Sequence, residues 1–432
     1  MKLLLGDLLD FTDDPSKTGL DAVRYLPDGA LLIDDQGRIA DRGAASDLQS
    51  KVSSSVPVYD YRGKLIIPGM IDTHVHYPQT PMIAAYGEQL LTWLTEHAFP
   101  TEEAFADYDH AAGVAETFLN ELVRNGTTTA LVFGTVHPQS VDAFFDKAQE
   151  RNLRMICGKV MMDRNCPDAL KDTAETSYAE SKALIDKWHG KDRLQYAVTP
   201  RFAPTSTPEQ LDACKRLLEE YPTVYMHTHT SENKKECEWV GELFPESSDY
   251  IDVYQQAGLL RRRSVLAHGI HLCDRELHAL ADHKCALAHC PTSNLFIGSG
   301  LFPLKRIREH NIHVGMGTDV GAGTSFSMLQ TYNEAYKVQQ LQGEKLSAYE
   351  GLYLATLGGA RALDLEGTIG QLETGCEADL VVLDPEATDL MRFRMQHLRS
   401  EDVHEKLFAL MMLGDDRAIR ATWIMGENQH NR

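Results

Sequence analysis

Long apolar runs are missing from this sequence, although hydrophobic residues make up 43% of it. No window approaches the roughly 20 consecutive apolar residues that a membrane-spanning helix needs. Positive charge is also scarce, since 42 Lys and Arg stand against 63 Asp and Glu and give a formal net charge of −21. A field of that sign repels phosphate backbones and anionic lipids. We therefore expect no nucleic-acid partner and no membrane partner, whereas an uncharged small molecule is not excluded as a ligand.

Paired cysteines are missing as well. The eight Cys include no C-x-x-C pair, which disfavours a structural zinc site built on cysteine and a thioredoxin-type redox site. The apolar stretch at residues 1–9 is too short for a signal peptide, and Asp7 interrupts it. We therefore expect a cytoplasmic protein whose cysteines are free thiols.

Eight short apolar runs alternate with amphipathic helical stretches between about residue 70 and residue 330. Such alternation is typical of βαβ units, and eight units predict an α/β fold with a closed (β/α)8 barrel of the TIM type. The expected strands are residues 71–76, 128–133, 154–161, 195–200, 224–229, 264–268, 285–290 and 313–318. The expected helices include residues 101–125, 141–151, 177–188, 208–220 and 348–363.

Both ends of the chain differ from this pattern, because they contain short strands and turns. The segment ALLID at residues 30–34 precedes a turn, and ADLVVLD at residues 378–384 has a similar composition. We expect the two ends to pair into one small β-sandwich domain beside the barrel. This predicts a discontinuous β domain, residues 1–67 and 372–432, and a barrel domain, residues 68–371.

Motifs rich in His and acidic residues fall at the ends of separate expected strands. They are Asp72-Thr73-His74-Val75-His76, His227-Thr228-His229-Thr230-Ser231-Glu232, Leu266-Ala267-His268-Gly269 and Met316-Gly317-Thr318-Asp319. Residues i and i+2 of a strand point to the same face, so His74 and His76 can reach one ion. Imidazole nitrogen and carboxylate oxygen suit Zn²⁺ or Fe²⁺ better than Mg²⁺ or Ca²⁺. The combination predicts a metal site at the mouth of the barrel, where such folds carry their function.

Each motif has a plainer interpretation when it is taken alone. A His-x-His pair can be two half-buried polar side chains, and His268 can be a hydrogen-bonded structural residue. Asp319 can cap a turn or a helix, and Glu232 can be a charged residue in the first turn of a helix. The order of the motifs, each at its own strand end, favours the metal site over separate coincidences.

Pro68-Gly69-Met70-Ile71-Asp72-Thr73-His74-Val75-His76 resembles the opening signature of the amidohydrolase superfamily of metal-dependent barrels, and the likeness extends along nearly the whole chain. Further segments are similar to the guanine deaminase branch of that superfamily. They are His76-Tyr77-Pro78-Gln79, Glu88-Gln89-Leu90-Leu91-Thr92-Trp93-Leu94, Phe99-Pro100-Thr101-Glu102, Thr199-Pro200-Arg201-Phe202 and Gly317-Thr318-Asp319-Val320-Gly321-Ala322-Gly323. The resemblance implies hydrolytic removal of the 2-amino group of guanine, which gives xanthine and ammonia in purine catabolism or salvage. Guanine and water would then be the small-molecule partners, and a homodimer is expected.

The resemblance also implies a set of metal ligands. The expected ligands of one Zn²⁺ per chain, with Fe²⁺ as the alternative, are His74, His76, His229 and Asp319. His227 shares a face with His229, but the family places its ligand three residues before the catalytic Glu, which selects His229. His227 is then expected to be a buried residue behind the site or in the packing. The strand-four end carries no Lys that could bridge two metals, and Lys159 on strand three is expected to be an ordinary residue.

Catalytic and base-binding residues follow from the same resemblance. Glu232 is the expected acid–base catalyst, and His268 and Asp319 are expected to hold the attacking water, with His268 also touching the substrate. Arg201 can match the O6 and N7 acceptors of guanine with two donors, and adenine would present a donor there instead. Gln79 offers an amide to another polar edge of the ring, and Phe202 can stack on its face. Arg201 could instead form a salt bridge at the barrel rim, and Phe202 could simply fill the core.

Two other kinds of function remain open at this point. A deaminase of cytosine, adenosine-like or triazine rings, or a halide-removing hydrolase, would share the metal site. A non-catalytic scaffold of the same fold is disfavoured, because such chains usually lose metal ligands and this sequence retains all of those expected.

Overall fold

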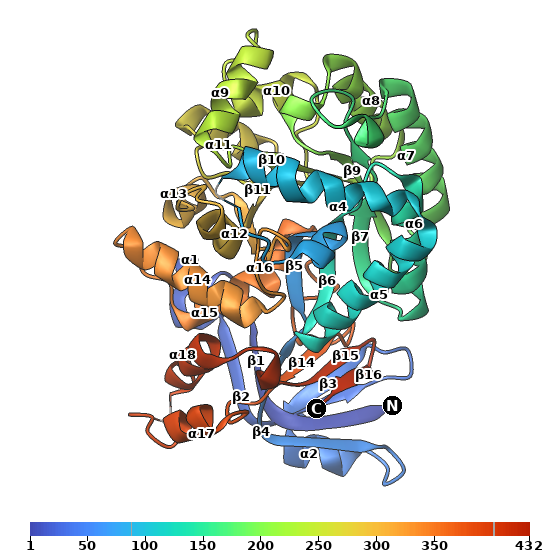
Figure 1. Cartoon of the computed structure of the whole chain (residues 1–432). Helices are drawn as coiled ribbons and strands as arrows, with labels where there is room; N and C mark the ends of the chain where they lie inside the picture. The colour runs from blue at the N-terminus through green and yellow to red at the C-terminus, as the bar shows by residue number, and fades with distance from the viewer. Residues whose placement is uncertain (88, 401) are drawn as a thin grey trace.

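The larger of two sheets forms a nearly closed barrel (Figure 1). The computed structural model describes residues 1–432 except residues 88 and 401. Eight parallel strands follow one another in the order β13-β12-β11-β10-β9-β7-β6-β5. They are β5 (Met70–His76), β6 (Thr127–Phe133), β7 (Arg154–Gly158), β9 (Gln195–Pro200), β10 (Tyr225–Thr230), β11 (Ser264–His268), β12 (Ala286–His289) and β13 (His313–Met316). The prediction of a (β/α)8 barrel is confirmed.

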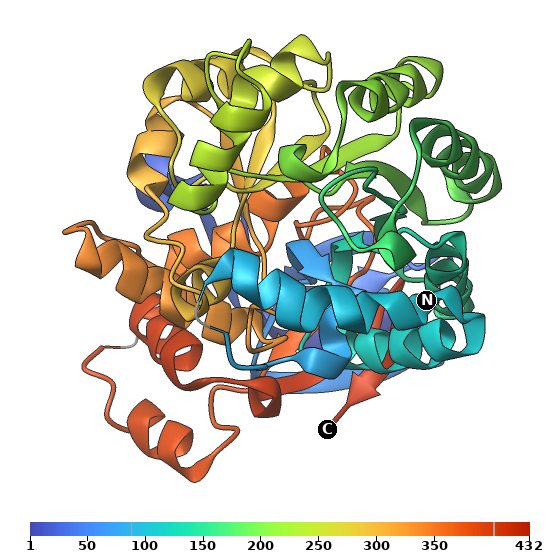
Figure 2. The same cartoon turned by 45° about the horizontal axis from the view of Figure 1, so that its top comes forward.

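The barrel closes between its first and last strands through the residues that follow β13. Asp319 N donates to the His74 carbonyl over 2.9 Å, and His76 N donates to the Val320 carbonyl over 2.8 Å. Helices wrap the outside of the barrel (Figure 2). The main ones are α5 (Tyr108–Arg124), α6 (Pro138–Glu150), α7 (Ala174–Trp188), α8 (Pro208–Glu220), α9 (Lys234–Leu243), α10 (Tyr250–Gln256), α11 (Asp274–Asp282), α12 (Pro291–Phe296), α13 (Leu304–Glu309), α14 (Met328–Leu341), α15 (Ala348–Leu354) and α16 (Leu357–Ala362).

Several expected elements are divided in the structure. The expected strand 154–161 becomes β7 and β8 (Val160–Met161), because Lys159 N leaves the ladder and donates to the Tyr196 hydroxyl over 3.1 Å. The expected helix 101–125 becomes α4 (Phe99–Glu103) and α5. Asp107 separates them, since its backbone is extended and its side chain accepts from His110 N to begin α5. The expected helix 348–363 is likewise divided into α15 and α16.

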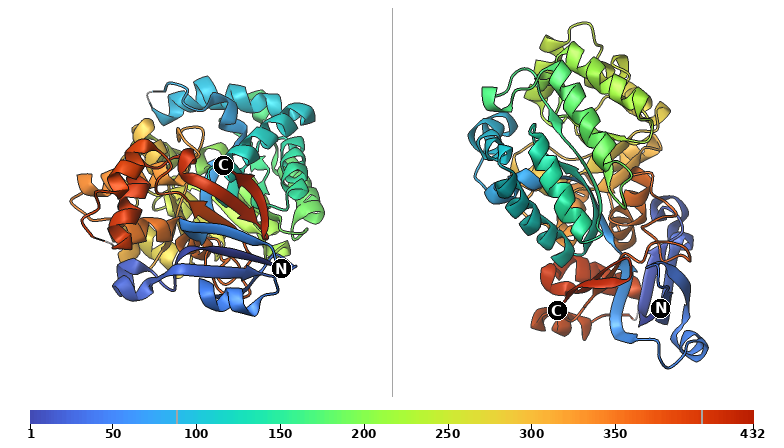
Figure 3. Two further views of the ribbon diagram at one scale, coloured as in Figure 1. Left: turned by 90° about the horizontal axis from the view of Figure 1, so that it is seen from below. Right: turned by 90° about the vertical axis from the view of Figure 1, so that its right-hand side faces the viewer.

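The smaller sheet is built from both ends of the chain, which lie side by side in Figure 3. Its order is β16-β15-β14-β4-β1-β2-β3, and hydrogen bonds join all seven strands into one sheet. The strands are β1 (Lys2–Phe11), β2 (Val23–Ile33), β3 (Ile39–Ala44), β4 (Val58–Pro68), β14 (Leu380–Leu383), β15 (Ile419–Ile424) and β16 (Glu427–Asn431). A separate sheet unit from the chain ends is thus confirmed, while the domain boundaries at residues 67/68 and 371/372 stay a prediction.

The C-terminal segment also contains two helices that the sequence analysis did not anticipate, α17 (Asp389–Met395) and α18 (Val403–Leu413). Among the described residues, no helix combines the length and the apolar character needed to cross the bilayer. All eight Cys are free thiols, as expected.

Candidate active site and metal centre

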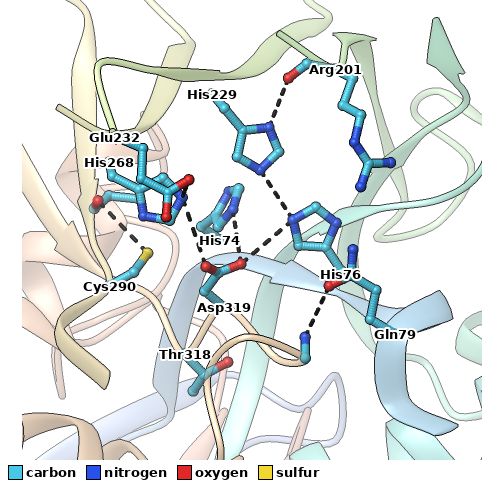
Figure 4. A network of polar contacts seen from close by, with 12 residues as sticks. His74, His76, Gln79, Arg201, His229, Glu232, His268, Cys290, Thr318 and Asp319 are labelled. Atoms are coloured by element: carbon cyan, nitrogen blue, oxygen red, sulfur yellow. Dashed lines mark hydrogen bonds and ion pairs between the residues drawn. The ribbon is translucent and has the colours of Figure 1, made fainter. Parts of the chain in front are cut away.

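The strand ends bring the four expected metal ligands into one cluster (Figure 4). Asp319 Oδ1 lies 3.2 Å from His74 Nε2 and 3.5 Å from His76 Nε2. His229 Nε2, from β10, lies 3.2 Å from His76 Nε2. His74 and His76 lie at the end of β5 and His229 at the end of β10, so all three face the barrel mouth. The hydrogen bonds that close the barrel hold Asp319 against β5. The structure therefore brings the three imidazoles and the carboxylate close together, as a shared ion would require.

The cluster has the donor chemistry of a divalent cation site. His229 Nδ1 donates to the Arg201 carbonyl over 2.7 Å, so Nε2 carries the lone pair and faces His76 Nε2. His74 Nε2 is buried without a hydrogen-bond partner. Burial holds the pKa of His74, His76 and His229 well below its usual value, so these rings are neutral. Neutral imidazoles that face one another and a carboxylate fit a metal ion of the zinc type.

His227 contacts the far side of this cluster. Its Nε2 lies 2.8 Å from His74 Nδ1, the ring nitrogen of His74 that faces away from Asp319. A hydrogen bond at that position sets which nitrogen of a ligating imidazole carries the proton. The geometry thus agrees with the interpretation of His227 as a buried residue behind the site.

Glu232 and His268 form the second part of the site, beside Asp319. His268 Nε2 lies 3.2 Å from Glu232 Oε2 and 3.7 Å from Asp319 Oδ2. His268 Nδ1 donates to Asn294 Oδ1 over 2.8 Å, which leaves the Nε2 lone pair directed at the two carboxyl groups. Burial, together with the charge of Asp319, raises the pKa of Glu232 to about 8. A carboxyl group with such a pKa holds a proton at neutral pH and can donate it.

Arg201 and Gln79 lie on the other side of the metal ligands from Glu232 and His268 (Figure 4). Both line one cavity, together with His76, His229, Glu232, His268 and Asp319. Arg201 also forms a buried salt bridge with Glu102. The structure is therefore compatible with both expectations for this residue, recognition of the base and a salt bridge. The remaining wall of the cavity is largely apolar and includes Leu90, Trp93, Leu94, Phe202, Ile297 and Ala322.

Three residues of this site received no role from the sequence alone. Glu102 was recognised only as part of a family segment, and Asn294 and Ser299 were not singled out. Ser299 Oγ donates to Glu232 Oε1 over 2.9 Å. The available signal for Asn294 and Ser299 was their place in the segment that follows the seventh barrel strand, at the end of the barrel that carries function. Glu88, part of another family segment, lies outside the described residues.

The Lys on the third strand is engaged away from the metal ligands. Lys159 is fully buried and forms ion pairs with Asp172 and with Glu180, the latter at 3.3 Å. Its charge is therefore already compensated, which agrees with the expectation that Lys159 does not bridge metals.

Comparisons with known proteins agree with this geometry. Residues 65–428 match the amidohydrolase family. Guanine deaminase of Escherichia coli (strain K12) is 53% identical over 435 residues, which cover 100% of this chain and 98% of that protein. The solved structure of E. coli guanine deaminase has a TM-score of 0.97 at 52% identity and covers 100% of both chains. Guanine deaminase from C. acetobutylicum, solved with bound guanine in the active site, has a TM-score of 0.88 at 28% identity over 99% of each chain. This chain therefore belongs to the amidohydrolase family, and within that family it resembles guanine deaminases over its full length.

Proposed function

We propose that this chain is a metal-dependent aminohydrolase that converts guanine and water into xanthine and ammonia. One observation carries the proposal: in a single cavity, the expected metal ligands lie between a protonated carboxyl on one side and a buried Arg and Gln on the other. A purine ring that contacts both sides would place one of its carbons at the metal ligands. The full-length similarity to guanine deaminases, one of them solved with guanine bound, supports the same substrate.

The metal ligands of this proposal are His74, His76, His229 and Asp319, and the proposed ion is one Zn²⁺, with Fe²⁺ as the alternative. When bound, such an ion supplies the positive charge that makes a water molecule nucleophilic near neutral pH. The neutral imidazoles and the absence of a bridging Lys at the strand-four end support a single ion.

The proton chemistry is assigned to Glu232, His268 and Asp319. Glu232 gives its proton to N3 of guanine, which breaks the aromatic amidine and makes C2 electrophilic. The lone pair of His268 Nε2, held in place by Asn294, accepts a hydrogen bond from the attacking water. As the C2–O bond forms, a water proton passes to this group of side chains and then to the 2-amino nitrogen. The C2–N bond breaks, ammonia leaves, and the second proton of the water returns to Glu232 as its oxygen becomes the 2-oxo group of xanthine.

Base selection is assigned to Arg201, Gln79 and Phe202. The buried guanidinium of Arg201 offers donors to O6 and N7, and adenine, which carries an amine at position 6, would lose about 1–3 kcal/mol at that contact. Gln79 offers its amide to another polar edge of the ring. Phe202 belongs to the apolar wall of the cavity, which supports its assignment to a face of the ring.

Ammonia release from guanine, adenine and cytosine by the purified protein tests this proposal. We expect release from guanine far in excess of the other two bases, and no release from guanine would refute the substrate assignment. Elemental analysis of the same preparation tests the metal, with one zinc or iron per chain as the expected result. Assembly as a homodimer and a cytoplasmic location also stay predictions, which gel filtration with light scattering and cell fractionation would check.

A further inference from the structure

Glu102 is a buried carboxylate that the proposed reaction does not use. It lies on α4, outside the barrel strands, and its side chain is only 1% exposed. Glu102 Oε2 accepts from Arg201 Nη1 over 2.6 Å, and Oε1 accepts from Arg201 Nη2 over 3.0 Å. Oε1 also accepts from Gln79 Nε2 over 3.0 Å. One carboxylate therefore joins the two side chains that are expected to recognise the base.

The contact with Glu102 decides which donors of Arg201 remain for a ligand. A guanidinium carries five N–H groups in one plane, and the carboxylate takes one from each Nη at its far end. The remaining pair of parallel N–H donors lies on the side edge of the guanidinium, which is formed by Nε and one Nη. Phe99, from the same helix α4, has its ring centroid 5.1 Å from Cζ of Arg201 and packs against the guanidinium. Arg201 is thus held at one end and against one aromatic ring, with its side edge free for the cavity.

Gln79 is fixed in a similar way. Its Nε2 donates to Glu102, and its Oε1 accepts from Gly321 N over 3.2 Å. The orientation of the amide is therefore defined at both ends, and one N–H and one lone pair remain for a ligand. Gly321 follows the metal ligand Asp319 by two residues, so this contact also ties the base-recognising side to the metal side.

The ion pair between Glu102 and Arg201 is a weak source of fold stability. Both side chains are almost completely buried, at 1% and 2% exposure, and both charges must leave water when the chain folds. That desolvation penalty cancels much of the attraction, and apolar residues of similar volume often serve stability equally well. Holding an Arg side chain in place before binding does, however, reduce the conformational entropy that a ligand must overcome.

We propose that Glu102 is a positioning residue that holds Arg201 and Gln79 as one unit and thereby makes the site selective for purines with a 6-oxo group. The inference rests on the proposed function and adds to it the residue that sets base selection. Glu102 is not one of the described residues that line the cavity. It therefore acts through Arg201 and Gln79 and does not touch the base.

The variant Glu102→Gln tests this inference. We expect KM for guanine to rise by roughly 10- to 100-fold with a smaller change in kcat, because the chemistry at C2 lies on the other side of the site. Calorimetric titration with xanthine, which has a 6-oxo group, should show a similar loss of affinity. Titration with 2-aminopurine, which lacks that oxygen, should change little. Metal content should match that of the parent protein, whereas the melting temperature should fall, because Arg201 is left buried without its carboxylate.

The neighbouring residue provides a matched control. Glu103 belongs to the same helix but is exposed, and Glu103→Gln should leave KM and both titrations unchanged. Glu102→Asp keeps the charge with a shorter reach, and it should give an intermediate loss if Glu102→Gln does not fold. The double variant Glu102→Gln/Arg201→Lys should be no worse for guanine than Arg201→Lys alone, because both changes remove the same unit.

The inference would be overturned by an unchanged KM for guanine in both Glu102 variants, by equal losses for xanthine and 2-aminopurine, or by additive losses in the double variant. Failure of the proposed function is a separate result. If the parent protein released no ammonia from guanine, the comparison of xanthine with 2-aminopurine would still decide whether Glu102 sets the preference for the 6-oxo group.

Discussion

Ser299 Oγ donates a hydrogen bond to Oε1 of Glu232 over 2.9 Å, and both side chains are buried. The two residues are 67 positions apart, and Asn294, the partner of His268, lies on α12, just before Ser299. The segment that follows β12 therefore holds both Glu232 and His268, to which the proton transfer is assigned. Because the hydroxyl stabilises the charged form of the carboxyl group, it limits the rise in the pKa of Glu232 that burial causes.

Ser299→Ala should therefore change the pH dependence of the reaction. Without the hydroxyl, the pKa of Glu232 rises further above its present value of about 8. The protonated form of Glu232 is the active form, so activity is lost as pH rises through that pKa, and the alkaline limb should move to higher pH. We also expect kcat at neutral pH to fall by roughly 3- to 10-fold, as for loss of one hydrogen bond. The measurement is kcat against pH.

A control for this change is Ser46→Ala, because Ser46 is exposed on α2 (Ala45–Lys51), in the smaller sheet unit. That variant should leave the profile in place. An alkaline limb that stays put in Ser299→Ala, or moves to lower pH, would show that Ser299 does not act on Glu232.

Glu232→Gln should retain the metal and lose most of its turnover. The amide keeps the size of the side chain and can still accept from Ser299, but it cannot give a proton to N3. General acid catalysis contributes about 10²- to 10⁴-fold, and we expect kcat to fall within that range. Glu238→Gln, a change on the exposed face of α9, is the matched control and should be fully active. A Glu232→Gln protein as active as the parent would rule out the proton-transfer assignment.

Removal of the metal should abolish ammonia release and lower the melting temperature. An ion that binds the folded chain but not the unfolded chain stabilises it by mass action, so removal of the ion takes that stabilisation away. Dialysis against a chelator followed by differential scanning calorimetry measures the loss, and added Zn²⁺ should restore both activity and stability. Full activity in a preparation with less than a tenth of an equivalent of metal would contradict the site.

The barrel strands were predictable because each is a short apolar run that ends in polar residues. The expected ranges 195–200 and 264–268 coincide with β9 and β11. Strands buried on both faces must be apolar throughout, and the chemistry begins where the apolar run stops. The convergence of His74 and His76 was predictable for the same reason, since the period of two places both residues on one face.

The contacts behind the site were not predictable in this way. Glu102 and Arg201 are 99 positions apart in the sequence, and no sequence motif around either residue indicates that the two form a pair. Such a pair is defined by where α4 packs against the barrel, which is a property of the assembled fold and not of local periodicity. Helices α17 and α18 were missed because the strand pattern at residues 378–384 was extended to the whole C-terminal segment.

A buried ion network joins the barrel to the C-terminal segment beneath it. Glu377 Oε2 accepts from Arg154 Nε over 2.9 Å and from Arg193 Nη2 over 2.8 Å, and Glu377 is only 4% exposed. Arg154 begins β7, and Arg193 precedes β9. Burial alone would raise the pKa of Glu377, but the two guanidinium groups outweigh it and hold that pKa below its ordinary value of 4.5.

Glu377→Gln should therefore destabilise the protein in a pH-dependent way. The change leaves Arg154 buried without its carboxylate and Arg193 with Asp379 alone, and we expect the free energy of unfolding to fall by about 3–5 kcal/mol at neutral pH. The folded state has the lower pKa, so the contribution of Glu377 is present above the unfolded value of 4.5 and is lost as pH falls below it. Urea titrations at pH 7 and near pH 4 measure both stabilities, and the difference between parent and variant should shrink at the lower pH.

Glu366→Gln is the control for this prediction, because Glu366 pairs with Arg361 through a carboxylate that is 49% exposed. It should cost less than about 1 kcal/mol at either pH. A difference between parent and Glu377→Gln that is equal at the two pH values, or grows on acidification, would contradict a carboxylate held ionised by Arg154 and Arg193.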